Sequence, residues 1–361
     1  MTELLISAVG PVFTVDGRLV RELARDCVRL EVSEGIEGLR TLQAHFLATG
    51  GDATGPPQPL LHLDGRELDF GRSMRVSLGP DRGQRFVFEG TVSAIELVLG
   101  DGEPPRVVVL AEDALMRLRM TRRMRTYTDL SDADIAREIA GLHGLQAEAG
   151  ADGPTYDVVQ QLNQSDLAFL RERARLVQAE IWAAGRTLHF RSRPQRTGTS
   201  LTLVHGNDLL SVRLCADLAE QRSACIVTGY DAAAQGVIDE EAGPDVVAAE
   251  SIGGRTGAAL VESALGKSTT YRVREAALTS AEAVAWARAE MLRRGRRFVT
   301  VTGTTRGSAD MEVGSRLRLA LVGAPFEGGG YYVTRVTHTF DNVQGFRTRF
   351  EAERSTLNEV A

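Results

Sequence analysis

Two distant segments of the chain share one pattern, in which a glycine is followed by alternating apolar residues. Residues 71–78 read GRSMRVSL and residues 314–321 read GSRLRLAL, and each segment is followed by Phe-Glu-Gly, at 88–90 and 326–328. The spacings, 314−71=243 and 326−88=238, differ by no more than a change in loop length. Unrelated strands bounded by glycine give similar patterns, because such strands are common. The alternative is a true repeat, which predicts two copies of one β-strand plan.

The chain has 361 residues, more than one hydrophobic core usually supports. Short alternating runs fill residues 14–110, two helical patterns appear between 116 and 193, and alternation returns from 201. We therefore predict a mainly β fold with an α+β insertion, in which two tube-like antiparallel β-barrels accompany a small α+β domain. The expected domains are a first β-barrel region, the α+β insertion, and a second β-barrel region with one helix at 280–294; their bounds are 1–115, 116–195 and 196–361.

Residues 156–190 predict a strand, an amphipathic helix and a returning strand. Asn163 and Ser165 are both N-cap residue types, and Asp166 suits the positive end of a helix dipole. We expect the helix to span Ser165 to Ile181, with Gly185 ending the run. Its apolar side chains and the residues that begin it are our candidates for the packing core of the insertion: Ser165, Asp166, Leu167, Phe169 and Leu170.

A second helix is predicted where Ser131 precedes Asp132 and Asp134. A serine can cap the helix and carboxylates favour its first turn, while His143-Gly144 is typical of a helix end. The segment 50–59, GGDATGPPQP, predicts an exposed, mobile loop, because glycine and proline interrupt both regular elements.

Charge and cysteine usage exclude several classes of protein. The formal net charge is −6, whereas broad binding to nucleic-acid phosphates requires clustered Lys and Arg, so we expect no sequence-specific nucleic-acid binding. Cys27, Cys215 and Cys225 lack CxxC spacing, which favours a reducing interior. The sequence contains no apolar run long enough to span a bilayer and begins with no signal-peptide pattern. We expect synthesis in the cytoplasm and no direct membrane insertion.

The sequence gives weak support to any chemical site. Gly266-Lys267-Ser268 imitates a phosphate-binding loop, but Val261 stands where the earlier glycine is required. The segment 253–257, GGRTG, is interpreted as a flexible loop between strands. The six histidines form no metal-ligand spacing, and no GxSxG elbow occurs. We predict no catalytic residue, no cofactor and no metal.

Two arginine clusters, at 117–125 and 288–297, are the main basic features. A solvated face is the ordinary explanation for such clusters. The alternative is complementarity to an acidic neighbour, where Arg is favoured because it pairs with carboxylates through two hydrogen bonds.

Several motifs follow one another along nearly the whole chain: RRMRTYTDLSDADI at 122–135, HGL at 143–145, Gln160 with NQSDLAFL at 163–170, VTGYD at 227–231, the helix at 286–298, Gly314 opening a strand, and GYYVTRVTH at 330–338. In this order they resemble the late control D family of contractile phage tails, whose hub fold also forms the N-terminal half of VgrG-type spikes.

The resemblance implies a trimeric baseplate hub, and three chains with two similar barrels each would present six similar units around one axis. Such a homotrimer joins the hexameric inner tube protein to the trimeric spike protein, among other baseplate proteins. Family members serve in phage tails, R-type bacteriocins, type VI machines and extracellular contractile injection systems, so the particle is either cytoplasmic or released. Gly90, Gly314, Gly330 and Tyr332 are our candidates in the barrel strands.

The sequence ends at Ala361, soon after the last matching strand, so we expect the spike tip to be a separate polypeptide. This expectation favours a hub of a phage-like tail or extracellular particle over a fused type VI spike. Two alternatives stay open. A hydrolytic tail enzyme requires a cleft with converging carboxylates or a metal, and a receptor- or sugar-binding β module requires exposed aromatic side chains.

Overall fold

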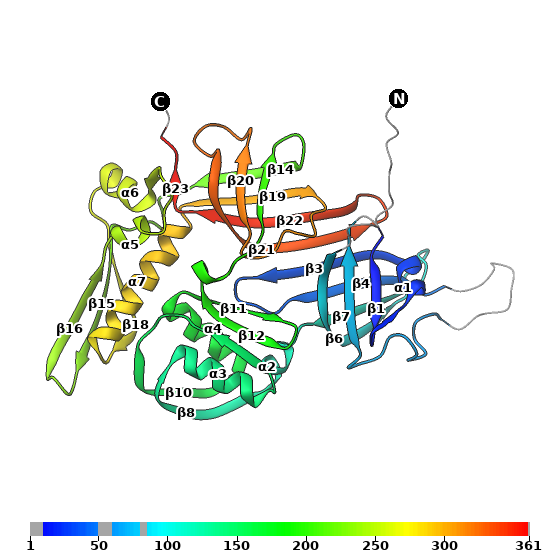
Figure 1. Ribbon diagram of the computed structural model, residues 1–361, viewed down its shortest axis with the longest axis horizontal. Coiled ribbons are helices and arrows are strands. Elements are labelled where there is room, and N and C mark those ends of the chain that lie inside the picture. The colour runs from blue at the N-terminus through cyan, green and yellow to red at the C-terminus, as the bar shows by residue number, and fades with distance from the viewer. Residues whose placement is uncertain (1–9, 50–59, 80–84, 360–361) are drawn as a thin grey trace.

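The computed structural model describes residues 10–49, 60–79 and 85–359, and its fold is mainly β (Figure 1). A large sheet contains strands from residues 12–112 and 200–354, and an α+β region and a helix-containing arm lie beside it. The loop predicted at 50–59 lies outside the described residues.

The first sheet unit is formed by residues 12–112. Its core follows from alternation, since inward-facing residues such as Leu30, Val32, Leu42 and Val109 are buried. Its elements are β1 (Val12–Val15), β2 (Arg18–Leu19), α1 (Arg21–Asp26), β3 (Cys27–Gly35), β4 (Thr41–Leu47), β5 (Ser73–Leu78), β6 (Arg85–Val98) and β7 (Arg106–Glu112).

The second sheet unit is formed by strands from residues 200–216 and 299–354, with Val301, Leu317, Val333 and Phe350 in its core. Its strands are β13 (Ser200–Val204), β14 (Leu209–Ala216), β19 (Val299–Arg306), β20 (Arg316–Ala320), β21 (Gly328–Asp341) and β22 (Gly345–Arg354). A short β23 (Thr356–Leu357) follows and pairs with β17 (Arg255–Thr256).

The two units repeat one five-strand arrangement. The order is β3-β4-β7-β6-β5 in the first and β14-β19-β22-β21-β20 in the second, with every neighbouring pair antiparallel. Strands in the same place also follow in the same order along the chain. A sixth strand differs, because β1 is antiparallel to β5 whereas β13 is parallel to β20. The predicted repeat of 71–78 in 314–321 thus coincides with β5 and β20.

The residue register repeats as well. In the first unit Thr91 opposes Glu112, and in the second Tyr332 opposes Glu353, so both strands shift by the same offset, 332−91=353−112=241. Each pair is interrupted by a β-bulge at the matching place, after Val92 in β6 and after Val333 in β21. Bulges re-aim strands and are specific features of a fold, so two in the same place indicate a duplicated unit.

One junction joins the two units into a single sheet. The second half of β21 pairs antiparallel with β3, from Arg335 opposite Gly35 to Asp341 opposite Arg29. The described strands form no closed sheet, because their order ends openly at β14 and β2. The number of barrels therefore stays a prediction.

The region between the units contains α2 (Met116–Met120), β8 (Arg122–Ser131), α3 (Asp132–Leu142), β9 (Gln146–Ala149), β10 (Thr155–Ser165), α4 (Asp166–Val177), β11 (Ala179–Ala184), β12 (Thr187–Ser192) and η1 (Arg193–Gln195). Ser131 caps α3 through a capping box with Asp134, as predicted. The predicted extension of α4 to Ile181 is wrong. Gln178 adopts a left-handed conformation (φ 53°) that ends the helix, and Ile181 lies in β11.

The arm between β14 and β19 contains three helices, which corrects the prediction of one helix after residue 196. Its elements are β15 (Ala224–Asp231), β16 (Gly236–Ala242), α5 (Asp245–Ala248), β17, α6 (Gly257–Leu265), β18 (Thr269–Ala277) and α7 (Ser280–Arg296). The GGRTG segment leads through β17 directly into α6, where Thr256 caps the helix, so it is not merely a loop. Near the end of the longer helix α7, a Cβ on Gly295 would lie 2.4 Å from Val247 Cγ2, so glycine at this position lets α5 pack against α7.

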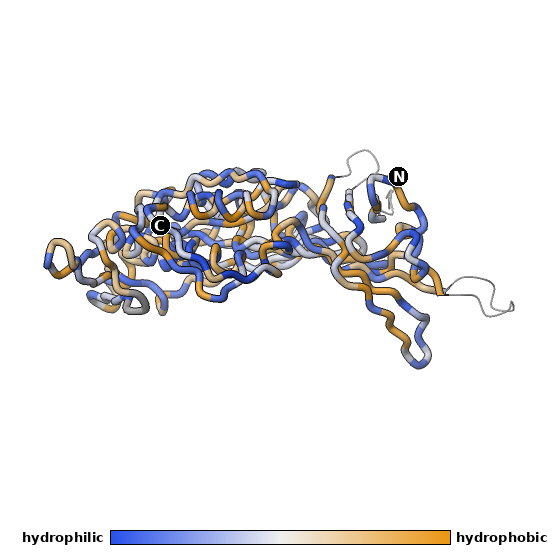
Figure 2. The backbone as a smooth tube through the Cα atoms, turned by 90° about the horizontal axis from the view of Figure 1, so that it is seen from below, coloured by the Kyte–Doolittle hydropathy of each residue, from blue (hydrophilic) through white to orange (hydrophobic). Residues whose placement is uncertain are grey.

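Three cores hold the molecule together. One lies in each sheet unit, and the third combines the α+β region with the arm, since Leu170 and Phe190 share a cluster with Trp286 and Met291. In Figure 2 the molecule is elongated, and apolar and polar segments alternate along much of the chain. The α+β region and the arm therefore pack as one body beside the sheet.

Candidate assembly surfaces

The start of α4 is the first predicted site, and it is an internal joint. The Ser165 hydroxyl accepts a hydrogen bond from the Ala168 N–H at 3.2 Å, as expected of an N-cap. The Asp166 carboxylate is fully buried and accepts from Arg123 Nε at 2.9 Å and Gln161 Nε2 at 2.8 Å, while a ring nitrogen of His143 lies 2.7 Å away. Asp166 thus ties α4 to β8, β10 and the end of α3.

The apolar candidates on α4 face the core. Leu167, Phe169 and Leu170 are buried, and the Phe169 ring stacks on Tyr127 with centroids 5.7 Å apart. These residues confer packing and offer no surface to a partner.

The glycine candidates serve the backbone of the sheet. Gly90 lies in β6, where a Cβ would lie 2.3 Å from the carbonyl oxygen of Glu112 on β7, so only glycine fits. Gly314 precedes β20 with a φ of 98°, which other residues rarely adopt. Gly330 lies in β21 with a φ of 89°.

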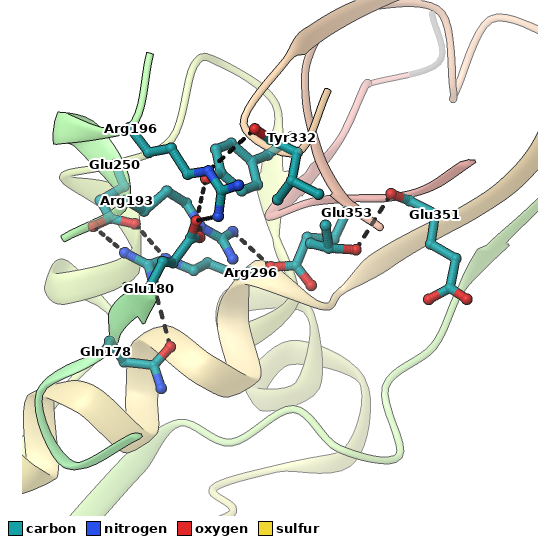
Figure 3. Close-up of polar contacts among 11 residues, drawn as sticks. Gln178, Glu180, Arg193, Arg196, Glu250, Arg296, Tyr332, Glu351 and Glu353 are labelled. Carbon is teal, nitrogen blue, oxygen red and sulfur yellow. Dashed lines mark hydrogen bonds and ion pairs between the residues drawn. The ribbon is translucent and has the colours of Figure 1, made fainter. Parts of the chain in front are cut away.

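Of the predicted residues, Tyr332 lies in a network of buried hydrogen bonds and ion pairs, which Figure 3 shows. Its hydroxyl donates to a Glu180 carboxylate oxygen at 2.5 Å, and the guanidinium groups of Arg193 and Arg316 lie over its ring, 4.2 and 4.3 Å from the ring centroid. Burial, followed by the negative charge of Glu180, raises the pKa of Tyr332. The contact joins β21 of the second unit to β11 of the α+β region.

Arg193 links the same regions by charge. It pairs with Glu353 on β22 at 2.6 Å and with Glu180 at 3.3 Å, although it is almost fully buried. Burial opposes its charge, but Glu353 and Glu180 outweigh that effect and raise the pKa of Arg193. Removing one partner of such a buried ion pair destabilises a protein by roughly several kcal/mol, because the other charge is left buried and unpaired.

A neighbouring pair brings in the arm. Arg296, at the end of α7, pairs with Glu250 just after α5 at 2.7 Å, and its guanidinium lies 3.3 Å from the Gln178 side-chain oxygen (Figure 3). A cavity of about 330 Å³ lies over these groups. Sequence reasoning placed Arg296 in a basic cluster but missed Glu180, Arg193, Glu250 and Glu353, because no local pattern marks partners so far apart in the chain.

A second joint involves β3 of the first sheet unit. The buried Glu34 carboxylate pairs with Arg196 at 2.7 Å and also with Arg40. Near it, Asp113 accepts hydrogen bonds from the backbone N–H groups of Arg40 and Leu115, and its burial raises the pKa of Asp113 to about 6. The α+β region is therefore fixed to both sheet units.

One row of polar residues crosses most of the sheet. Directly opposed residues on eight successive strands form a row that crosses the β3–β21 junction without interruption. In strand order from β14 to β6 the row is Ser211, Thr304, Arg349, Thr337, Ser33, Thr41, Glu112 and Thr91. A hollow of about 440 Å³ lies over its β14 end. None of these eight residues is buried, whereas their neighbours along the strands, such as Val32, Leu42 and Val336, are buried in the cores.

The arginine clusters are largely paired within the chain. Arg119, Arg123 and Arg125 form ion pairs with Glu112, Asp166 and Glu138, and the second cluster pairs with Glu220, Glu250 and Glu290. Neither the solvated nor the partner-binding explanation accounts for them fully, because intramolecular carboxylates neutralise most of their charge.

Within the described ranges, His, Cys, Asp and Glu form no group of three or more with the geometry to hold a metal ion. In the same residues, no helix combines the length and apolarity needed to cross a bilayer.

Solved structures with this fold come from phage tails and a secretion system. The chain is similar to the 43 kDa tail protein of prophage MuSo2 from Shewanella oneidensis, with a TM-score of 0.68 at 13% identity over 96% of this chain and 98% of that one. A tail protein from Neisseria meningitidis MC58 gives 0.65 at 12% identity over 96% of each chain. The E. coli c3393 protein, described as a component of the type VI secretion system, gives 0.58 at 12% identity over 93% and 76%.

No curated protein matches the sequence significantly. A family model does match, and it is described as the Alg8 N-terminal domain rather than as late control D. The match extends over residues 57–342 and so includes strands of both sheet units, the α+β region and the arm. The chain therefore belongs to the family of the Alg8 N-terminal domain.

Proposed function

We propose that this chain is a structural baseplate hub of a contractile, phage-tail-like particle, and that it is not an enzyme. In this proposal three copies form a ring that joins a hexameric inner tube to a trimeric spike, in contact with other baseplate proteins. The observation that carries the proposal is the duplicated sheet unit, since three chains with two matching units each give six units around one axis.

Two further observations support this role. The fold is shared with proteins described as phage tail proteins and with a type VI secretion component. The buried ion pairs of Glu180, Arg193 and Glu34 fix the α+β region against the sheet, as a load-transmitting part requires. Symmetry matching is then the mechanism: the sixfold tube contacts near-equivalent units, and the spike contacts three equal chains.

Light scattering tests the proposal on the purified chain, first alone and then mixed with the tube and spike proteins of the same particle. We expect a mass of three subunits, alone or with the spike, and co-elution with both partners. A chain that stays monomeric and binds neither partner contradicts the hub role. An unrelated trimeric protein of similar charge is the control for nonspecific association.

A further inference from the structure

Two strand edges of the sheet lack the neighbour that their counterparts have. Among the described residues, β14 pairs along its length only with β19, whereas its counterpart β3 pairs with both β4 and β21. The second half of β6, beyond Val92, likewise pairs only with β7, whereas the matching half of β21 pairs with both β22 and β3. One matching pair of edges is thus joined inside the chain and the other is open.

Side chains at the joined edges are more buried than their counterparts at the open edges. Leu30 and Val32 on β3 are fully buried, but their counterparts on β14, Val212 and Leu214, are only half-buried. His338 on β21 is 6% exposed, whereas its counterpart Leu97 on β6 is 40% exposed. Open edges that display apolar side chains are surfaces for adding another strand.

We propose that the open edge of β14 in one copy of the chain pairs antiparallel with β6 of the next copy, in the register of the β3–β21 junction. The inference deepens the proposed hub and takes the number of copies, three, from it. The partner is a second copy because β14 corresponds to β3 and β6 corresponds to β21. The β3–β21 junction inside the chain shows that strands in these two places pair with each other.

The duplicated register specifies the contact residue by residue. Residues of β21 map onto β6 by subtracting 241, and residues of β3 map onto β14 by adding 209−27=182, with matching bulges in β3 and β14. The junction pair Thr337–Ser33 therefore becomes Glu96–Cys215. Five of the seven junction pairs map onto residues of β6, and the pairs expected between copies are therefore Ala94–Asp217, Ile95–Ala216, Glu96–Cys215, Leu97–Leu214 and Val98–Arg213.

The chemistry of the expected pairs is compatible. Leu97 and Leu214 would bury each other on the core side of the sheet. On the polar side, Glu96 lies diagonally from Arg213, within reach of an ion pair between long side chains. Because the contact joins two different edges, it propagates head to tail and closes into a ring when the rotation allows, leaving no open edge of this pair.

The substitution Glu96→Cys tests the register, because Cys215 is already an exposed thiol. At the junction inside the chain, the matching side-chain oxygens of Ser33 and Thr337 lie 3.2 Å apart. Directly opposed residues of antiparallel strands have Cα atoms about 4.5 to 5.5 Å apart, a spacing that a disulfide can bridge. After mild oxidation of the assembled protein, we expect a covalent trimer on a non-reducing gel, and nothing larger.

Three variants serve as controls. Glu96→Cys with Cys215→Ser should give only single chains, and Leu97→Cys, which points to the other face, should link poorly. Ser33→Cys with Thr337→Cys, in a Cys215→Ser background, should form an internal disulfide without a change in mass, which confirms that the chain folds and that the oxidation works.

The outcomes separate the interface from the hub. If unmodified protein has the mass of three subunits but Glu96→Cys forms no links while the internal control does, the proposed interface is wrong and the trimer stands. If linked species extend beyond three chains, the edges pair but the ring of three is wrong. A monomer under every condition, with no cross-links, contradicts both the interface and the hub.

Discussion

Individual residues show which information is local in this sequence. Ser131 and Ser165 were identifiable as caps because a cap bonds residues three positions away. The same helix start contains Asp166, whose role depends on Arg123 and on His143, and no spacing in the sequence connects them. Likewise, Tyr332 was recognised through a family motif, but its partner Glu180 lies 152 residues away. Buried charge networks are therefore the part of the site that sequence reasoning misses.

The core side of α4 gives a prediction at this scale. Leu170→Asp places a carboxylate in the core that also contains Leu167, Phe169 and Ile139, so we expect a loss of at least about 3 kcal/mol in the free energy of unfolding. Urea denaturation followed by circular dichroism measures it. Ala168→Asp is the matched control, because Ala168 is exposed and an acidic residue favours the first helical turn. Equal stability of the two variants contradicts the packing role of Leu170.

At the scale of elements, strands and long capped helices were predictable and short elements were not. Alternation located β3, β5 and β6, and the apolar stripes located α3 and α7. The helix α6 was missed because two glycines precede it and suggest a loop, and α5 has only four residues. The end of α4 was misplaced because Gln178, a residue type without a strong turn signal, adopts the left-handed conformation.

The pairing of β6 with β7 gives the prediction at this scale. Gly90→Ala introduces a Cβ 2.3 Å from the Glu112 carbonyl oxygen, so one strand must shift, and we expect a loss of about 1 to 3 kcal/mol or more. Gly100→Ala is the control, since its Cβ would meet only the Glu103 side chain at 3.6 Å. Thermal unfolding compares the two. A destabilisation at Gly100 as large as at Gly90 contradicts the steric explanation.

At the scale of the whole molecule, the repeat predicted two similar units, but no sequence pattern predicted how they join. The β3–β21 junction pairs residues about 300 positions apart, and its register depends on bulges that alternation does not reveal. The three expected domains, with bounds 1–115, 116–195 and 196–361, stay a prediction, and so do the closed barrels. The first and last of these regions nevertheless share one sheet.

His338 at this junction makes the stability of the whole molecule depend on pH. Burial, followed by the charge of Arg40, lowers the pKa of His338 to about 4. Unfolding raises it towards about 6.5, so the unfolded chain binds the proton first and stability is lost as the pH falls from 6.5 to 4. We expect His338→Gln to reduce the loss in unfolding free energy between pH 7.5 and pH 4.5, by at most about 3 kcal/mol. Urea titrations at the two pH values measure the difference.

Asp113 acts in the opposite direction and supplies the comparison. Its pKa of about 6 lies above the value of an unfolded aspartate, so its contribution is full below about 4 and is lost as the pH rises through 6. In the His338→Gln variant, protonation of Asp113 should stabilise the folded chain as the pH falls through 6. Adding Asp113→Asn should remove that gain in the free energy of unfolding. Two variants with the same pH profile as the unmodified chain contradict both assignments.

The β3–β21 junction has a kinetic consequence. Because both of its strands belong to one polypeptide, the junction forms at an effective concentration set by the connecting chain, and dilution does not dissociate it. The equilibrium concentration of a ring built from six separate molecules depends on the sixth power of the concentration of free molecules. Building it from three fused pairs lowers that dependence to the third power, so such a ring can nucleate on a rare spike from a small pool of subunits.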